Sequence, residues 1–328
     1  MKRSLLRSGF TEMKYDTGRL LINYAQGPPG ETPLFLIPGQ TMPWESYTRV
    51  LKGLSEHFEI YAVDVHGHGS SGWIPDGEYR FSTMGADFVS MLNEVVCRPA
   101  IVSGNSSGGL LAAWIAANAP ESVLGIVTED PPFFSSEWPR LRDDTYVYRI
   151  MKLSAETLMG SKGRDLSAFF KEFELPVEGK KRLMTLPKPL SLFISMILKV
   201  YQGIRRGEPV DLPFLPLDAR LFIRGLSEYD PKFSASFLDC SPVVDFDHTE
   251  ILSRINCPLL LMHAHWFRHD RFGLVGALDD DDVERVRSLV GNFRYRRIET
   301  GHVMHLHRPV DFIDGMLEMK EWVREDQS

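Results

Sequence analysis

The 328-residue sequence predicts an α/β fold, in which a mostly parallel central sheet is flanked by helices. Short apolar runs, several of them nearly continuous, alternate along the chain with stretches of helical periodicity. A continuous apolar run suits a strand that is covered on both faces. Strands that alternate with helices form largely parallel sheets with helices on both sides. The expected strands are 20–25, 33–39, 59–65, 100–104, 124–130, 258–264 and 293–299, and the expected helices are 44–57, 81–96, 107–119, 280–291 and 309–325.

The alternation stops after the strand at 124–130 and resumes at 258–264. Residues 133–254 are instead rich in helix-forming and aromatic residues, with several prolines between the runs. A structureless loop of that length is not expected in a compact domain, so this segment should be a helical insertion. We therefore predict a core domain formed by 1–132 and 255–328, and a helical cap, 133–254, over the carboxyl edge of the sheet.

Composition and charge narrow the class of protein. A hydrophobic content of 43% is typical of a globular chain, and a net charge of −7 disfavours a nucleic-acid partner. The first ten residues, MKRSLLRSGF, lack the apolar region of a secretory signal, and no apolar run reaches the roughly 20 residues of a membrane span. Cys97, Cys240 and Cys257 are odd in number and widely spaced, which favours reduced thiols. We expect a cytoplasmic protein without a membrane partner, and homo-oligomerisation is compatible with these features.

Residues 101–114, IVSGNSSGGLLAAW, place a G-x-S-x-G motif between an apolar strand and an apolar helix. Such a turn, called a nucleophile elbow, presents the hydroxyl of its central serine, here Ser106. Gly104 and Gly108 suit the turn because they carry no side chain that could clash. The alternative is a glycine-rich turn in which Ser106 or Ser107 simply caps the helix. Ser106 is the predicted nucleophile.

A base must accept the serine proton, because a serine hydroxyl is otherwise a poor nucleophile. His302 follows the strand at 293–299 and precedes the helix at 309–325, so it should lie at the same sheet edge as the serine turn. It is the predicted general base. His305 and His307 in the same loop are the alternatives.

The acid of a catalytic triad orients the histidine and stabilises its charged form. Asp130 ends an apolar strand and is followed by two prolines, so its carboxylate should face the same edge. Asp270, after the strand at 258–264, is a second candidate, and Glu129 a third. Spacing along the chain leaves the choice open.

An oxyanion hole needs two backbone N–H donors. One is expected from the residue after the nucleophile, Ser107, and the other from the turn after the strand at 33–39. In that turn Gly39 frees the backbone, and the N–H of Gln40 is the predicted donor. The alternative is that PGQT is an ordinary turn.

Eight of the ten histidines lie in VDVHGHGSSG, LMHAHWFRHD and GHVMHLH, and His-x-His pairs at strand ends are what a zinc hydrolase would use. However, no carboxylate bridges these histidines at an obvious spacing. The prediction is therefore that the protein uses no metal and no other cofactor, and that His66 and His68 shape the loop beside the catalytic edge.

The order of these parts resembles the α/β-hydrolase superfamily. A closer likeness, to the bacterial zearalenone-lactone hydrolases, is spread over most of the chain. The segments that carry it are LFLIPGQTMPWESY, FEIYAVDVHGHGSSGW, GNSSGGLLAAW, EDPPFFSSE, EYDPKF, LVGALDDD and HVMHLHRP.

In that family the triad is the serine of GNSSGG, an aspartate in a motif like EDAPF and the first histidine of a motif like HMMHL. The resemblance thus implies Ser106, Asp130 and His302. This chain departs from the family in two places. After the strand at 33–39 it has PGQT, whereas the family has an acidic residue in place of the glycine, and its motif EDPPF has an extra proline. The cap matches only patchily.

The resemblance implies an α/β-hydrolase fold with a helical cap inserted after the sixth strand. It also implies a serine hydrolase that opens the lactone of a resorcylic acid macrolactone such as zearalenone through an acyl-enzyme. A general carboxylesterase or a carbon–carbon hydrolase is the alternative within enzymes, and a non-catalytic binder of a small hydrophobic ligand is the alternative outside them.

A large apolar ring needs a large apolar pocket. The candidate lining residues could equally be ordinary core, because aromatic residues and methionines at helical spacing usually pack helices. These candidates are Trp138, Tyr148, Phe193, Met196, Phe222 and Trp266.

Overall fold

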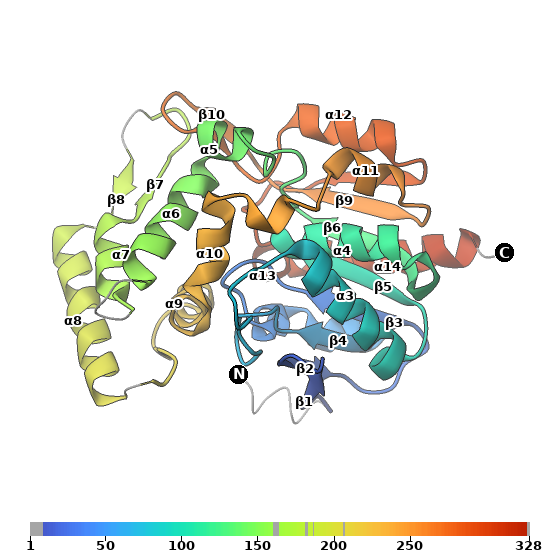
Figure 1. Ribbon diagram of the computed structural model, residues 1–328, viewed down its shortest axis with the longest axis horizontal. Helices are drawn as coiled ribbons and strands as arrows, with labels where there is room; N and C mark the ends of the chain where they lie inside the picture. The colour runs from blue at the N-terminus through green and yellow to red at the C-terminus, as the bar shows by residue number, and fades with distance from the viewer. Residues whose placement is uncertain (1–8, 160–163, 181–182, 186, 206, 327–328) are drawn as a thin grey trace.

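The computed structural model describes residues 9–159, 164–180, 183–185, 187–205 and 207–326 (Figure 1). Its centre is an eight-stranded sheet in the order β1-β2-β4-β3-β5-β6-β9-β12. The pairs β1–β2 and β2–β4 are antiparallel and the remaining pairs are parallel, which confirms the predicted sheet. The strands are β1 (Thr11–Asp16), β2 (Leu21–Gln26), β3 (Pro33–Ile37), β4 (Glu59–Val63), β5 (Ala100–Asn105), β6 (Val123–Glu129), β9 (Leu259–His263) and β12 (Phe293–Arg297).

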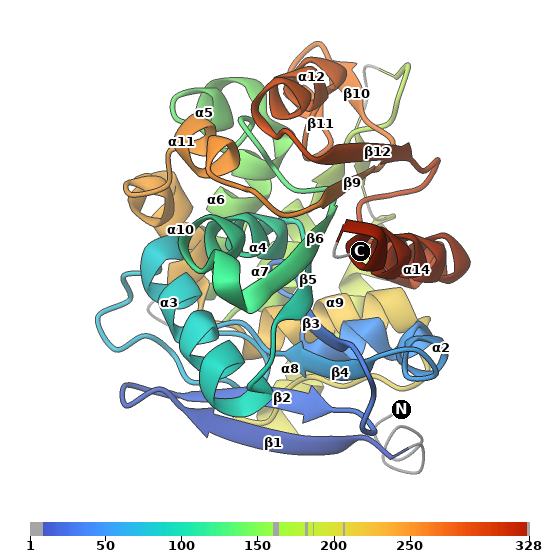
Figure 2. The ribbon, with the colours of Figure 1, turned by 90° about the vertical axis from the view of Figure 1, so that its right-hand side faces the viewer.

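Helices cover both faces of the sheet, as Figure 2 shows end-on, with α3 and α4 on one side and α2 and α14 on the other. Each face carries its own apolar cluster, because β3, β4, β5, β6 and β9 are buried almost throughout and point side chains both ways. The core helices are α2 (Leu51–Leu54), α3 (Phe81–Met91), α4 (Ser107–Asn118), α12 (Asp280–Leu289), α13 (Met304–His307) and α14 (Pro309–Asp326), with shorter turns η1 (Trp44–Arg49), η2 (Leu92–Val96) and η3 (Pro120–Ser122).

Two parts of the core differ from the sequence-based expectation. Strand β1 was not expected, because its residues TEMKYD are largely exposed and gain their place by pairing with β2 at the sheet edge. The helix expected over 44–57 is divided into the 3₁₀ turn η1 and the short helix α2. Glu45 and Ser46 are buried beside Trp44 in η1, so this segment lacks the polar outer face of a surface helix.

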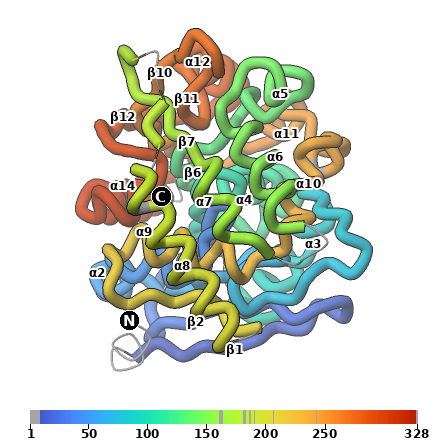
Figure 3. The backbone as a smooth tube through the Cα atoms, turned by 90° about the vertical axis from the view of Figure 1, so that its left-hand side faces the viewer, coloured from blue at the N-terminus to red at the C-terminus, as the bar shows by residue number. Residues whose placement is uncertain are grey.

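The segment between β6 and β9, which follows the sixth strand, is helical. Figures 1 and 3 show α6, α7 and α8 on one side of the sheet, where α7 packs on α8 and α6 packs on α10. The exact division of the chain at residues 132 and 255 stays a prediction. The elements are α5 (Arg140–Asp144), α6 (Tyr146–Leu158), α7 (Leu166–Glu172), β7 (Glu174–Leu175), β8 (Met184–Thr185), α8 (Lys188–Ile204), α9 (Leu217–Glu228), α10 (Pro231–Leu238), η4 (Ser241–Val243) and α11 (His248–Ser253).

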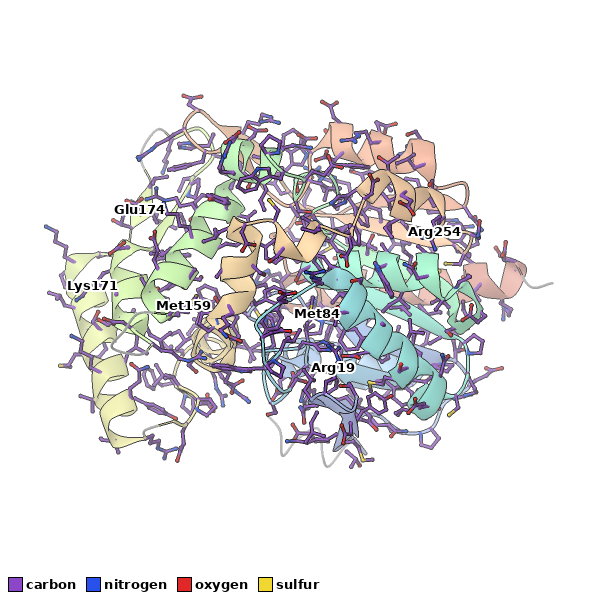
Figure 4. The ribbon with its side chains drawn as sticks, in the orientation of Figure 1. Arg19, Met84, Met159, Lys171, Glu174 and Arg254 are labelled. Carbon is purple, nitrogen blue, oxygen red and sulfur yellow. The ribbon has the colours of Figure 1, made fainter. Side chains whose placement is uncertain are left out.

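Side chains hold this segment together and join its last helix to the core (Figure 4). Glu174 accepts a hydrogen bond from Arg149 of α6 at 2.7 Å. After α11, Arg254 donates to the carbonyl of Ala117 near the end of α4 at 3.1 Å. Helix α11 therefore packs on α4 and α12 instead of on the helices to the left of Figure 1.

The helical segment contacts the core through the loops at the carboxyl ends of β3 and β4. A Cβ atom on Gly225 of α9 would lie 1.6 Å from the carbonyl oxygen of Thr41, so only glycine fits there. Asp230 donates its backbone N–H to the Gly67 carbonyl at 2.6 Å and accepts from the Tyr79 hydroxyl at 2.8 Å. These contacts set helices α9 and α10 over the carboxyl edge of the sheet.

Two further expectations concern cysteines and membranes. Cys97, Cys240 and Cys257 are all free thiols. Within the residues described, no helix is both long enough and apolar enough to cross a membrane.

Candidate active site

Ser106 stands between the end of β5 and the start of α4 with φ 53° and ψ −123°. This left-handed φ is costly for a residue with a side chain, and such strain is typical of functional sites. The turn is held by two hydrogen bonds, from the Ser106 N–H to the Glu129 carbonyl at 2.9 Å and from the Gly109 N–H to the Ser106 carbonyl at 2.8 Å. The serine side chain is thus presented by a rigid strand–turn–helix unit.

The glycines of the motif are required by backbone contacts on each side of the serine. A Cβ atom on Gly104 would lie 2.0 Å from the Gly108 carbonyl oxygen. One on Gly108 would lie 2.3 Å from the carbonyl oxygen of Ile37, at the end of β3. Because backbone atoms cannot move aside as a flexible side chain can, the turn closes only without these side chains.

We expect Gly104→Ala to destabilise the protein by about 3 kcal/mol, the upper end of the usual cost of overpacking, because backbone atoms cannot move aside. Thermal unfolding of the variant and the parent checks this. Gly291→Ala is the matched control, since a Cβ atom there meets nothing within 4 Å. A melting temperature for Gly104→Ala equal to that of Gly291→Ala would contradict the packing assigned to this turn.

The structure brings His302 and Asp130 together. The His302 Nδ1 atom lies 2.6 Å from Asp130 Oδ2, across 172 residues of sequence. The Asp130 side chain is 2% exposed and that of His302 is 43% exposed, so the acid is enclosed and the imidazole is open to a substrate. Asp130 has φ 46°, and its Oδ1 accepts the backbone N–H of Ala264 at 3.1 Å. The carboxylate is therefore fixed from both sides.

The environment of His302 favours its charged form. Partial loss of hydration lowers the pKa of His302, but the hydrogen bond and the negative charge of Asp130, with a contribution from Glu129, outweigh this effect. The pKa of the imidazole lies above its ordinary value as a result. This is the electrostatic condition that stabilises an imidazolium during proton transfer.

Asn105, which sequence reasoning did not single out, joins the serine turn to the histidine loop. Its side-chain Nδ2 donates to the His302 carbonyl at 3.1 Å and to the Glu129 carbonyl at 3.3 Å. The residue just before Ser106 thus anchors the loops of both predicted partners. No signal in the sequence could have found this role, because the donor and the His302 acceptor are 197 residues apart.

The alternative bases and acids have other surroundings. His305 is fully buried and its Nδ1 lies 2.7 Å from Glu129 Oε2, so these two candidates pair with each other. His307 lies 3.2 Å from Asp218 of α9. Asp270 is exposed in the turn between β10 (Phe267–His269) and β11 (Gly273–Val275).

The two predicted oxyanion donors belong to segments that adjoin the serine. Ser107 is the first residue of α4, a position whose backbone N–H has no acceptor within its own helix. A Cβ atom on Gly39 would lie 3.0 Å from the Cβ of Ser106, so the turn that carries Gln40 packs directly on the serine. The Gln40 side chain donates to Ser234 of α10, whose hydroxyl lies 2.9 Å from that of Tyr229. A polar group from the helical segment therefore holds this turn.

The six candidate pocket residues have different surroundings. Trp138 lines a cavity of about 320 Å³ that also contains His248. The ring of Tyr148 lies 6.2 Å from that of Trp138. The ring of Phe222 packs against Phe169 at 6.1 Å.

Of the other three candidates, two are more exposed. Phe193 and Met196 lie on the solvent-exposed side of α8, 53% and 56% exposed. Trp266 donates its ring N–H to Asp280 at 2.9 Å. Contact of any of the six with a substrate stays a prediction.

The histidines that suggested a metal alternative have protein partners. His66 Nε2 lies 2.8 Å from Asp87. Asp87 also accepts a hydrogen bond at 2.6 Å from Arg19, which is labelled in Figure 4. His68 Nδ1 lies 2.9 Å from the His66 carbonyl oxygen, and His263 Nδ1 lies 3.0 Å from the Tyr295 hydroxyl. In the part of the chain that the structure describes, no three His, Cys, Asp or Glu side chains are gathered as metal ligands.

A strained serine turn, a buried acid and an exposed histidine at the carboxyl edge of a parallel sheet agree with one family of proteins. A family model described as the alpha/beta hydrolase fold matches residues 32–309. The chain belongs to the α/β-hydrolase fold family.

A curated relative of this α/β hydrolase matches only part of the chain. A pimeloyl acyl-carrier protein methyl ester esterase of Pectobacterium carotovorum subsp. carotovorum (strain PC1) is 31% identical over 119 residues. The match covers 35% of this chain and 44% of that protein, so the chain spans less than half the length of this curated relative.

Two solved structures match the α/β hydrolase over almost their whole length. The enol-lactonase of Burkholderia xenovorans LB400 has a TM-score of 0.63 and 15% identity, covering 94% of this chain and 100% of that one. A hydrolase of Pseudomonas aeruginosa PA01 has a TM-score of 0.63 and 19% identity, covering 94% and 97%. At these identities the likeness shows a shared fold.

Proposed function

We propose that this α/β hydrolase is a serine hydrolase of ester bonds that works through an acyl-enzyme, and that it opens a resorcylic acid macrolactone of the zearalenone type. The observation that carries the ester-hydrolase part of the proposal is the 2.6 Å contact between buried Asp130 and exposed His302, and the macrolactone part rests on the sequence resemblance. Asn105 links this pair to the strained turn of Ser106. These groups match the requirements of nucleophilic catalysis.

The proposed reaction begins with proton transfer from Ser106 to His302. Hydrogen bonding of Nδ1–H to Asp130 fixes the ring tautomer and leaves Nε2 as the acceptor. The Ser106 Oγ atom then forms a bond with the ester carbonyl carbon, and the carbonyl oxygen becomes an oxyanion. The backbone N–H groups of Ser107 and Gln40 donate to that oxyanion.

The second half of the reaction returns the protein to its starting state. Protonated His302 gives its proton to the leaving alkoxide, and neutral His302 then takes a proton from the water that attacks the acyl-enzyme. Ser106 leaves as the hydroxyl, carrying that proton. In a lactone the acyl and alkoxide parts remain joined, so the product is one hydroxy acid.

A direct comparison of substrates tests the proposed specificity. The expected result is that zearalenone is opened with a kcat/KM at least about tenfold above that of a short-chain nitrophenyl ester. Apolar contacts between a pocket and the larger substrate give discrimination of that order. The opened ring is followed by mass spectrometry as the addition of one water.

Other outcomes of this experiment assign other functions. Hydrolysis of the nitrophenyl ester without ring opening would make the protein a general carboxylesterase. Saturable binding of the lactone with no turnover of either compound would make it a non-catalytic binder.

A further inference from the structure

Two buried ionisable side chains next to Asp130 and His302 have no part in the proposed reaction. Glu129 and His305 both have fully buried side chains, and His305 Nδ1 lies 2.7 Å from Glu129 Oε2. The other carboxylate oxygen, Oε1, accepts the backbone N–H groups of Met304 and of His305, the latter at 3.1 Å. One carboxylate thus binds three N–H groups of the short segment that directly follows His302.

We propose that Glu129 and His305 form a positioning pair that holds the His302 loop at the correct distance from Asp130. The proposal rests on the proposed function and assigns no contact with substrate to either residue. Glu129 and Asp130 are neighbours at the end of β6, so the same strand end binds the His302 ring through one carboxylate and the following turn, α13, through the other. The two pairs together fix both ends of the segment 302–305.

The His302 loop needs such an anchor because it is open on its other side. His302 is 43% exposed, and a Cβ atom on Gly301 would meet only His307 Nδ1, at 3.8 Å. Helix α13 has four residues, too few to be stable through its own hydrogen bonds. Met304 and His305 are buried, and their hydrogen bonds to Glu129 add a fixed direction to this packing.

The His305 ring extends this support toward the oxyanion turn. It lies on the ring of Tyr47 with centroids 4.1 Å apart, and the Tyr47 hydroxyl donates to the Ile37 carbonyl at 3.0 Å. Ile37 ends β3, just before the turn that carries Gly39 and Gln40. The pair therefore joins the histidine loop, the acid strand and the oxyanion turn through buried contacts.

His305 is unsuited to act as the base itself. Its Nε2 atom is buried without a hydrogen-bond partner among the residues described. A proton on Nδ1, donated to Glu129, leaves Nε2 bare, and this tautomer avoids a buried unpaired N–H. A substrate at the sheet edge meets His302 instead.

Glu129 also acts on His302 through its charge. Among the groups that affect the pKa of His302, the negative charges of Asp130 and Glu129 both raise it. Removal of the Glu129 charge should therefore lower the pKa of His302. Because the reaction needs neutral His302, the acid limb of kcat/KM should then move to lower pH.

Two substitutions separate the effect of the Glu129 charge from the effect of its side-chain length. Glu129→Gln keeps the length and removes the charge, whereas Glu129→Asp keeps the charge and is too short for all three N–H groups. We expect kcat to fall about 10²-fold in both, with KM nearly unchanged, because a misplacement of about 1 Å has this effect. The acid limb should move to lower pH in Glu129→Gln and stay in place in Glu129→Asp.

Glu59→Gln is the matched control. Glu59 is also buried, but it lies at the amino end of β4, on the sheet edge away from His302, and accepts a hydrogen bond from the Tyr61 hydroxyl at 2.7 Å. This substitution should leave kcat and the pH profile unchanged. If the Glu129 variants fail to fold, His305→Phe keeps a ring on Tyr47 and removes the bond to Glu129, and it should show the same loss of kcat. A folded Glu129→Gln or His305→Phe with parental kcat would overturn the proposal.

An NMR titration of the His302 ring in the Ser106→Ala background tests the pair without any substrate. The Glu129→Gln substitution should lower the pKa of His302 in that background. An unchanged titration would overturn the proposed coupling even in a protein that proves to hydrolyse esters. A lowered pKa in a protein that hydrolyses none of the esters would contradict the proposed function and leave the coupling standing.

Discussion

Ser106→Ala should reduce kcat for ester or lactone hydrolysis about 10⁴-fold or more, because removal of a triad nucleophile leaves only binding and oxyanion stabilisation. The fold should be retained, since the backbone hydrogen bonds of the turn do not use the hydroxyl. Steady-state kinetics measures the loss. A fluorophosphonate, which phosphonylates serine nucleophiles with loss of fluoride, should label the parent protein at Ser106 and leave the variant unlabelled.

Ser107→Ala is the matched control for this experiment. Ser107 is proposed to act through its backbone N–H, which alanine retains, so kcat should change only a few-fold. Parental activity in Ser106→Ala, or a loss in Ser107→Ala equal to that in Ser106→Ala, would mean that the nucleophile has been assigned to the wrong residue.

Asp130→Asn should reduce kcat about 10⁴-fold, the size of effect seen when a triad histidine is held in the wrong tautomer. Asp130 Oδ1 accepts the N–H of Ala264, so the asparagine should place its oxygen there and turn its NH₂ group toward His302. His302 Nδ1 would then accept a hydrogen bond and Nε2 would carry the proton. A ring in that tautomer cannot accept the proton of Ser106.

The pH dependence of kcat/KM should differ between the parent protein and Asp130→Asn in a direction that the structure predicts. Asp130 raises the pKa of His302, so in the parent protein kcat/KM should fall as pH decreases through a midpoint above about 6.5, the ordinary value for histidine. In Asp130→Asn the charge is lost, and the residual activity should persist to lower pH. A pH–rate profile of both proteins checks this.

Asp270→Asn is the control that the sequence itself suggests. Asp270 is exposed in the β10–β11 turn, and its replacement should leave kcat and the pH profile unchanged. A larger loss in Asp270→Asn than in Asp130→Asn would transfer the role of the acid to Asp270.

Features set by neighbouring residues could be predicted from the sequence. The apolar runs of the sheet and the glycines around Ser106 express local requirements, burial on two faces and a turn without side chains, that leave a pattern in consecutive residues. The position of His302 after a strand predicted that it lies at the same sheet edge as Asp130, which it contacts in the structure. Strand β1 escaped prediction because its exposed residues have no apolar pattern, and its pairing with β2 is a tertiary contact.

Contacts between distant residues were decided by the tertiary structure. Because side chains alternate along a strand, Glu129 and Asp130 are expected to face different ways, but this pattern does not show that one binds His305 and the other His302. The aromatic residues of the helical segment show the same limit, since Phe222 packs inside it and Phe193 is exposed, although both have helical spacing. The sequence by itself thus determined the sheet, the serine turn and the kinds of groups at its edge. Which carboxylate meets which histidine was decided only by the folded chain, because that choice depends on loops up to 176 residues apart converging at one strand end.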